Sequence, residues 1–212
     1  MRVISTEQHP IPEDEIATLS PLLPLLFEAF ESATEEACQF FETRGRPVNR
    51  PLFPALVRYQ AKEHLEQHGQ IVDDLDTEDI GNNGLSLIHR ARRVRIWKAE
   101  DDELPAPGTS RPKTLFLNQQ LGLFLPEHGN PSTIELNLAL LWNVDRNHRL
   151  KALHLACPKS AFYTWSPAQA WWTVQLRHPG SATGVEVREP PVAPGDLPLR
   201  RIEPEADARE AG

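Results

Sequence analysis

Two histidines, His64 and His68, lie four residues apart in a segment whose apolar spacing predicts a helix. Residues at this spacing share one helical face, and such pairs occur in many zinc sites. In metalloproteases a glutamate directly follows the first histidine, whereas here Leu65 holds that place and Glu66 comes next. No third ligand lies nearby in the sequence. We expect no bound metal, and a metal-dependent hydrolase or nuclease using His64 and His68 is one alternative.

A basic run between residues 90 and 98 is the second candidate. Basic residues beside an aromatic ring bind single-stranded nucleic acid through phosphate contacts and stacking. On a strand, however, adjacent arginines point to opposite faces, and acids follow at residues 100–103. We therefore expect a solvated edge strand whose charges prevent aggregation. Binding of a protein or of nucleic acid is the alternative, through Arg92, Arg93, Arg95 and Trp97.

A third candidate is an aromatic cluster comprising Trp142, Tyr163, Trp165, Trp171 and Trp172. Large aromatic residues anchor protein interfaces as well as cores. The apolar content of residues 162–172 is typical of a lid over the sheet. A partly exposed contact surface, with Trp165 and Trp171 as partner-binding residues, is the second interpretation.

Catalytic patterns are weak elsewhere. Ser160 lacks the glycine-flanked turn of hydrolase nucleophiles, and His154 and Cys157 would face opposite sides of one strand. The acidic segment at 73–79 lacks the glycine-centred loop of a calcium site. No glycine-rich phosphate loop is present. We therefore expect no enzymatic activity and no cofactor.

Charge and composition narrow the class of protein further. The chain has 212 residues and a net charge of −8, which argues against a protein that coats DNA. Its longest apolar run, residues 22–27, is too short for a membrane span, and no secretory signal is present. The two cysteines, Cys38 and Cys157, are expected to be free and buried. Abundant arginine and proline suggest a GC-rich bacterial genome, and we expect a cytoplasmic protein.

Helices are predicted first along the chain. One begins at Ser20 and Pro21 and ends at Gly45; the next begins after Asn49 and ends at Gly69. The second helix carries two apolar stripes, which predicts packing on two sides. Residues 71–83, rich in acids, are predicted to form a turn.

Strands follow, recognised by an apolar period of two. They are expected at 85–97, in one piece or broken near Arg90, at 114–118, at 134–142, at 150–157 and at 171–176. The expected fold is α+β, with two N-terminal helices packed on a mostly antiparallel sheet of about five strands. We expect a lead-in segment at 1–14, one domain at 15–178, and a disordered, proline-rich, acidic tail at 179–212.

The tail contains a short apolar and basic segment between acids, the form of a motif that orders on binding. Its candidate partner-binding residues are Leu197, Leu199, Arg200, Arg201 and Ile202. Together these patterns favour a non-enzymatic interaction or regulatory accessory protein, with a toxin–antitoxin or phage-defence operon as one setting. Its partner would be another protein; nucleic acid is disfavoured and no membrane is expected.

Overall fold

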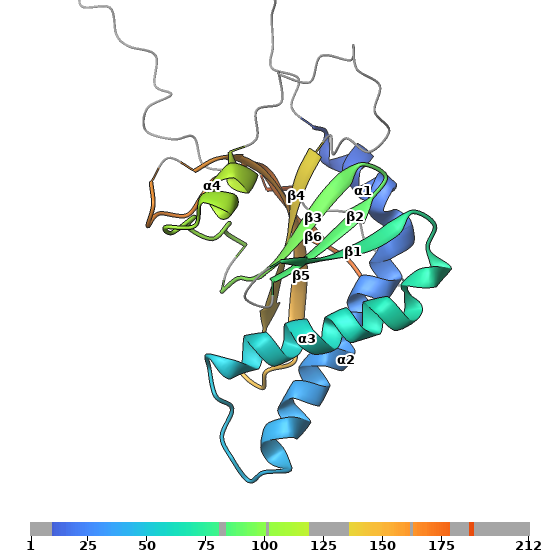
Figure 1. The fold of residues 1–212 in the computed structure, drawn as a ribbon, viewed down its shortest axis with the longest axis vertical. Helices are drawn as coiled ribbons and strands as arrows, with labels where there is room; N and C mark the ends of the chain where they lie inside the picture. The colour runs from blue at the N-terminus through green and yellow to red at the C-terminus, as the bar shows by residue number, and fades with distance from the viewer. Residues whose placement is uncertain are drawn as a thin grey trace, which may run out of the picture.

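The protein is an α+β fold in which helices cover both faces of a mixed sheet (Figure 1). The structure is a computed structural model that describes residues 10–80, 84–100, 102–118, 136–161, 163–178 and 187–188. The helices are α1 (Pro12–Leu19), α2 (Leu23–Glu42), α3 (Leu52–His68) and α4 (Arg111–Leu117), with short 3-10 turns η1 (Ser20–Leu22) and η2 (Gly69–Ile71). The strands are β1 (Leu75–Ile80), β2 (Gly84–His89), β3 (Arg92–Lys98), β4 (Leu136–Val144), β5 (Leu150–Ser160), β6 (Gln169–Leu176) and β7 (Val187–Arg188).

The strands of this sheet lie side by side in chain order, from β1 to β7. All neighbouring pairs are antiparallel except β3 and β4, which are parallel, with Val94 opposite Leu138. A parallel pair needs a crossover connection, and α4 lies in that crossover. The predicted α+β fold, with N-terminal helices on a mostly antiparallel sheet, is confirmed; the described residues form somewhat more strands than the predicted five, and one central pair is parallel.

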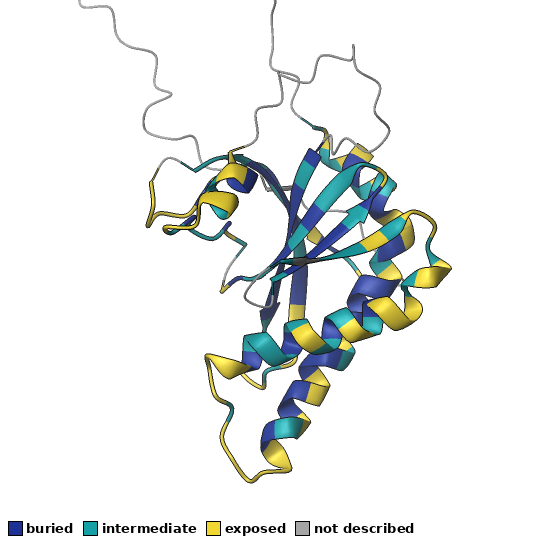
Figure 2. Ribbon diagram, viewed as in Figure 1, coloured by how far each residue is buried: buried dark blue, intermediate teal, exposed yellow. Residues whose placement is uncertain are grey.

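The main core lies between the sheet and the helices α1, α2 and α3, whose inner faces are buried (Figure 2). Strand β4 contributes Leu136, Leu138, Leu140 and Trp142 to it. Trp142 is fully buried, as predicted, and its ring centroid lies 5.8 Å from that of Phe30 on α2. The β4–β5 hairpin predicted from alternation is confirmed, and β5 passes Pro158 by a shift in register.

The α2–α3 hairpin begins and ends as the sequence predicts. Gly45, with φ of 61°, follows α2, and the Asn49 side chain accepts a hydrogen bond from the Leu52 amide at the start of α3. However, α3 is buried along one stripe only, comprising Phe53, Val57, Ala61 and Leu65. Helix α3 contacts both α2 and the strands β1 and β2, as predicted, but of the second stripe only Leu56 packs against the core, whereas Leu52 and Tyr59 are exposed.

Two segments differ in type from their prediction. Residues 75–80 form β1 at one edge of the sheet, paired with β2, although their acidic composition indicated a turn. An edge strand needs few apolar residues, which explains its polar composition. Residues 111–117 form α4 rather than a strand: the Ser110 hydroxyl accepts a hydrogen bond from the Lys113 amide, and Pro112 lies in the first turn.

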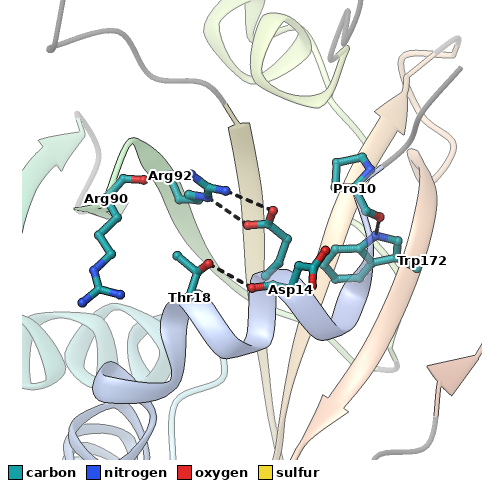
Figure 3. A network of polar contacts seen from close by, with 7 residues as sticks. Pro10, Asp14, Thr18, Arg90, Arg92 and Trp172 are labelled. Atoms are coloured by element: carbon teal, nitrogen blue, oxygen red, sulfur yellow. Dashed lines mark hydrogen bonds and ion pairs between the residues drawn. The ribbon is translucent and has the colours of Figure 1, made fainter.

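Helix α1 lies across one end of the sheet, and hydrogen bonds join it and the residues before it to β3 and to β6 (Figure 3). The Glu15 carboxylate accepts two hydrogen bonds from the Arg92 guanidinium on β3, at 2.9 and 3.3 Å. The Trp172 indole on β6 donates to the carbonyl oxygen of Pro10 at 2.6 Å. The end of the predicted lead-in segment is therefore helical, because α1 begins at Pro12.

The helical stretch Pro12–Glu42, made of α1, η1 and α2, is long and apolar enough to cross a membrane by length and composition. A buried core helix and an N-terminal signal pass the same test, so the expectation that no helix spans a membrane stays a prediction. Helix α2 buries its apolar face in the main core and exposes Glu28, Glu31, Glu35 and Glu36, which is the pattern of a core helix. Cys38 and Cys157 are buried and form no disulfide, as predicted, and burial raises the pKa of the Cys38 thiol.

Candidate interaction surface

Helix α4 covers the face of the sheet opposite the main core and forms a second, smaller apolar layer with it. Phe116 and Leu117 are buried against Leu141 of β4 and Ala156 of β5. The Phe116 ring meets the edge of Trp97 on β3, with centroids 5.3 Å apart and planes at 83°. The sequence folds this way because side chains alternate along β3, so that Arg93, Arg95 and Trp97 all face α4.

Two cations lie against this aromatic pair. The Arg95 guanidinium carbon is 5.4 Å from the centroid of the Trp97 ring and 5.6 Å from that of Phe116. The Lys113 ammonium nitrogen is 5.8 Å from the Trp97 centroid. Burial lowers the pKa of Arg95 and the charge of Arg93 lowers it further, while the charge of Glu78 opposes both; burial and then the charge of Arg95 lower the pKa of Lys113. Within the described chain, neither cation makes an ion pair with an acid.

The loop between β5 and β6 lies against the α4 crossover and presents two aromatic side chains to solvent. The Gly108 amide donates to the Thr164 carbonyl at 2.8 Å, and the Ala161 amide donates to the Asn118 side chain at 2.6 Å. Next to these two contacts in the loop, the exposed fractions of Tyr163 and Trp165 are 71% and 78%. Leu115, on the outer face of α4, is 64% exposed.

We name the α4 surface as Leu115, Tyr163 and Trp165 together with Arg95 and Lys113. These residues come from β3, α4 and the β5–β6 loop, and the loop is hydrogen-bonded to the chain on either side of α4 (Figure 1). This part of the molecule offers exposed apolar side chains and partly desolvated positive charge. Such a combination is typical of interfaces, where tryptophan, tyrosine and arginine contribute most of the binding energy.

The arginines of β3 have different roles. Arg92 faces the main core and pairs with Glu15, whereas Arg93 faces α4 and its Nε lies 3.3 Å from Glu78 Oε2. Arg90 lies in the β2–β3 turn with φ of 47°. The expectation of an edge strand is wrong, because β3 pairs with β2 on one side and β4 on the other. Of the predicted basic run, Arg95 and Trp97 join the α4 surface, and Arg92 does not.

The aromatic cluster divides between core and surface. Trp142 and Trp172 are buried in the main core, and Trp171 packs partly buried against it, with the Lys159 ammonium 4.5 Å from its ring centroid. Trp165 and Tyr163 are the members that remain exposed. The predicted tail motif at 197–202 and the other residues beyond 188 lie outside the described residues.

His64 and His68 lie side by side on α3, with ring centroids 4.5 Å apart. The nearest acid to the first is Glu28 of α2, whose Oε1 is 3.9 Å from His64 Nε2. Over the described ranges, no three histidine, cysteine, aspartate or glutamate side chains gather in a geometry that could hold a metal ion. His154 and Cys157 lie three apart on β5, where Cys157 faces the main core.

Sequence reasoning missed Lys113 and Phe116, because residues 114–118 were predicted as a strand. The signal was present in Ser110 followed by Arg111 and Pro112, a capping residue before a proline in the first turn. It also missed that Arg95 and Lys113, from two elements separated in sequence, both lie against the Trp97 ring. The crossover between the parallel strands β3 and β4 brings Lys113 to the Trp97 ring, where Arg95 also lies.

Comparisons with known proteins do not assign the chain to a group. No family model matches the sequence, and neither the curated proteins nor the solved structures contain a match.

Proposed function

We propose that the protein is a non-enzymatic interaction protein, an accessory or regulatory subunit, that binds another protein through its α4 surface. The observation that carries this proposal is the exposure of Trp165 and Tyr163, two residues apart, on a loop bonded to the α4 crossover. Two large aromatic side chains exposed within three residues are unlike the scattered single apolar residues of an ordinary surface, and such exposed apolar groups mark contact sites.

Burial of Tyr163 and Trp165 by a partner would contribute favourable free energy to binding. A buried aromatic side chain removes on the order of 200 Å² from water, and apolar burial contributes about 25 cal/mol per Å². Covering the exposed parts of Tyr163 and Trp165 would therefore contribute on the order of 5 kcal/mol before the entropy cost of association. These residues alone can form the centre of a hot spot.

The test uses two matched pairs of substitutions. Tyr163→Ser with Trp165→Ser removes the aromatic anchors of the α4 surface, and Leu52→Ser with Tyr59→Ser removes exposed apolar residues of α3 as the control. Tagged proteins are purified from the source organism, and the co-purifying proteins are quantified against the unsubstituted chain. We expect one stoichiometric partner to be lost from the first variant and retained by the second.

Retention of every partner by the Tyr163 and Trp165 variant would contradict the proposal. So would loss of the same partner from both variants, because it would show that the α4 surface has no special role. Both variants must first show the unfolding midpoint of the unsubstituted protein. All four side chains are more than two fifths exposed, so their removal should change stability little.

The metal-dependent alternative draws on the adjacent rings of His64 and His68. Its test is metal analysis of the purified protein with His64→Ala as control: a tightly held equimolar metal, lost in that variant, would favour a hydrolase or nuclease. The nucleic-acid alternative has less support, because Arg92 and Arg93 already pair with Glu15 and Glu78.

A further inference from the structure

Arg95 and Lys113 form an arrangement that costs free energy in the isolated chain. Both charges lie within 6 Å of the Trp97 ring centroid, and they are close enough for Arg95 to disfavour the charged form of Lys113. Both are also partly withdrawn from water. Contact with the aromatic faces offsets part of this cost. An ionised acceptor on a partner would offset the rest, because charge-assisted hydrogen bonds are the stronger ones.

A buried hydroxyl points to the same place independently. Ser86 on β2 lies directly opposite Arg95 in the register of the sheet and faces the α4 side. It is fully buried, and its Oγ has no hydrogen-bond partner among the described residues. Buried hydroxyls without a partner are rare in natural proteins, so this one calls for a reason. Its register position puts it next to Arg95, the residue whose guanidinium an anion would approach.

We propose that Arg95 and Lys113 bind a carboxylate of an acidic and apolar segment in the partner protein, with Ser86 supporting the site. This inference rests on the proposed function and names the chemistry of the partner. The guanidinium offers paired donors that match the two oxygens of a carboxylate, and the ammonium adds a second charge. Leu115, Tyr163 and Trp165 would contact the apolar residues of the same segment.

Charge around the site favours a carboxylate of a protein over the phosphates of a nucleic acid. Glu78 lies on the same face of the sheet, and Asp102 and Glu103 directly precede Leu104, which is buried in the α4 layer. The whole chain carries −8. A nucleic acid binds tightly when several cations of a protein neutralise several of its phosphates. Two cations flanked by acids are too few to do this. Binding of a single acidic side chain requires only Arg95 and Lys113.

The first experiment measures binding of a defined probe by calorimetry at low salt. The probe is a short capped peptide of aspartate, glutamate and leucine, and an oligothymidylate of the same net charge is the comparison. We expect the peptide to bind the unsubstituted protein, and to bind Arg95→Met or Lys113→Met about 10- to 100-fold more weakly, the effect of losing one charge-assisted hydrogen bond. Arg146→Met, in the exposed β4–β5 turn, is the matched control and should bind as the unsubstituted chain does.

The second experiment separates a binding role from a structural one by thermal unfolding without peptide. Methionine keeps the apolar stem but removes the charge, so Arg95→Met and Lys113→Met should leave the melting temperature unchanged or raise it. A lowered melting temperature would show that an acid of this chain already pairs with these cations, and would overturn the inference. Absence of peptide binding, equal binding by the variants, or preference for the oligothymidylate would overturn it as well.

The two proposals fail in different ways. If Tyr163→Ser with Trp165→Ser abolishes partner capture while Arg95→Met and Lys113→Met leave it intact, the interaction surface stands and the carboxylate site is refuted. If the aromatic variant retains every partner while the peptide still requires Arg95 and Lys113, the carboxylate site stands and the proposed function is refuted.

Discussion

The Glu15–Arg92 pair should be essential for holding α1 on the sheet. The two residues are 77 positions apart in the sequence, and their contact joins α1 to β3 with two hydrogen bonds. The Glu15 side chain is 7% exposed and that of Arg92 is 23% exposed. Changing Glu15 to Gln would keep the shape of the side chain and remove the negative charge that Arg92 faces.

The size of the effect follows from this burial. Removing one partner of a fully buried ion pair costs about 3–5 kcal/mol, because the other charge remains buried without a counter-ion. Arg92 keeps some contact with water and also donates to the carbonyl oxygen of Arg90 at 3.0 Å, which reduces the cost. We therefore expect Glu15→Gln to lower the free energy of unfolding by about 2–3 kcal/mol. For a domain of this size the melting temperature would fall by roughly 5–10 °C.

The assay is urea unfolding followed by circular dichroism for Glu15→Gln, Arg92→Gln and the double variant. The coupling energy from this cycle should be about 1.5–3 kcal/mol, since each residue acts through the other. The control is Arg149→Gln, which breaks the solvent-exposed pair with Glu35 and should leave stability within the error of the measurement. A coupling below about 0.5 kcal/mol would refute the argument and return Arg92 to the list of residues available to a partner.

Three further predictions concern the core and the α4 layer. Leu138→Asp should abolish cooperative unfolding, because Leu138 is fully buried and the new charge would have no partner; a soluble, cooperatively unfolding variant would show that β4 is misplaced. His89→Leu should raise the free energy of unfolding by about 1 kcal/mol in urea titrations, since His89 is fully buried and neither ring nitrogen has a partner among the described residues; a loss of stability would contradict this. The pKa of Lys113 is lowered on folding, so its charged form destabilises the protein at pH values below the folded pKa, and this penalty disappears as pH rises to the unfolded value of 10.5. The stability advantage of Lys113→Met should therefore shrink between neutral pH and pH 10.5, and an advantage that grows with pH would contradict the shift.

Much of the fold could be predicted from local patterns. Helix α2 and the β4–β5 hairpin have strong apolar periods, and Asn49 and Gly45 mark helix ends by their backbone chemistry. Strand β1 could not be found in this way, because an edge strand with one partner needs few apolar residues. The seven residues of α4 are too few to show a helical period, and their threonine, phenylalanine and leucine favoured a strand.

The candidate site was predictable only in part, for a physical reason. Arg95, Trp97 and Trp165 stand out by residue type, and each was identified from the sequence. Whether a strand is central or at an edge depends on its neighbours, so the pairing of β3 with β4 could not be read from residues 92–98. The same holds for Lys113, whose place beside Arg95 depends on the path of the crossover. Arg92 was selected by its charge, but its partner Glu15 lies in a distant helix.

Site-specific photocrosslinking in the source organism tests the interaction surface most directly. A photoreactive phenylalanine analogue is placed at Trp165 in one variant and at Tyr59 in the other, since both side chains are more than half exposed. The account predicts one specific crosslinked protein from position 165, lost when Arg95→Met and Lys113→Met are added, and no such product from position 59. A partner captured at position 59 and not at position 165 would contradict the central claim, because it would place the interface on α3 instead of the α4 surface.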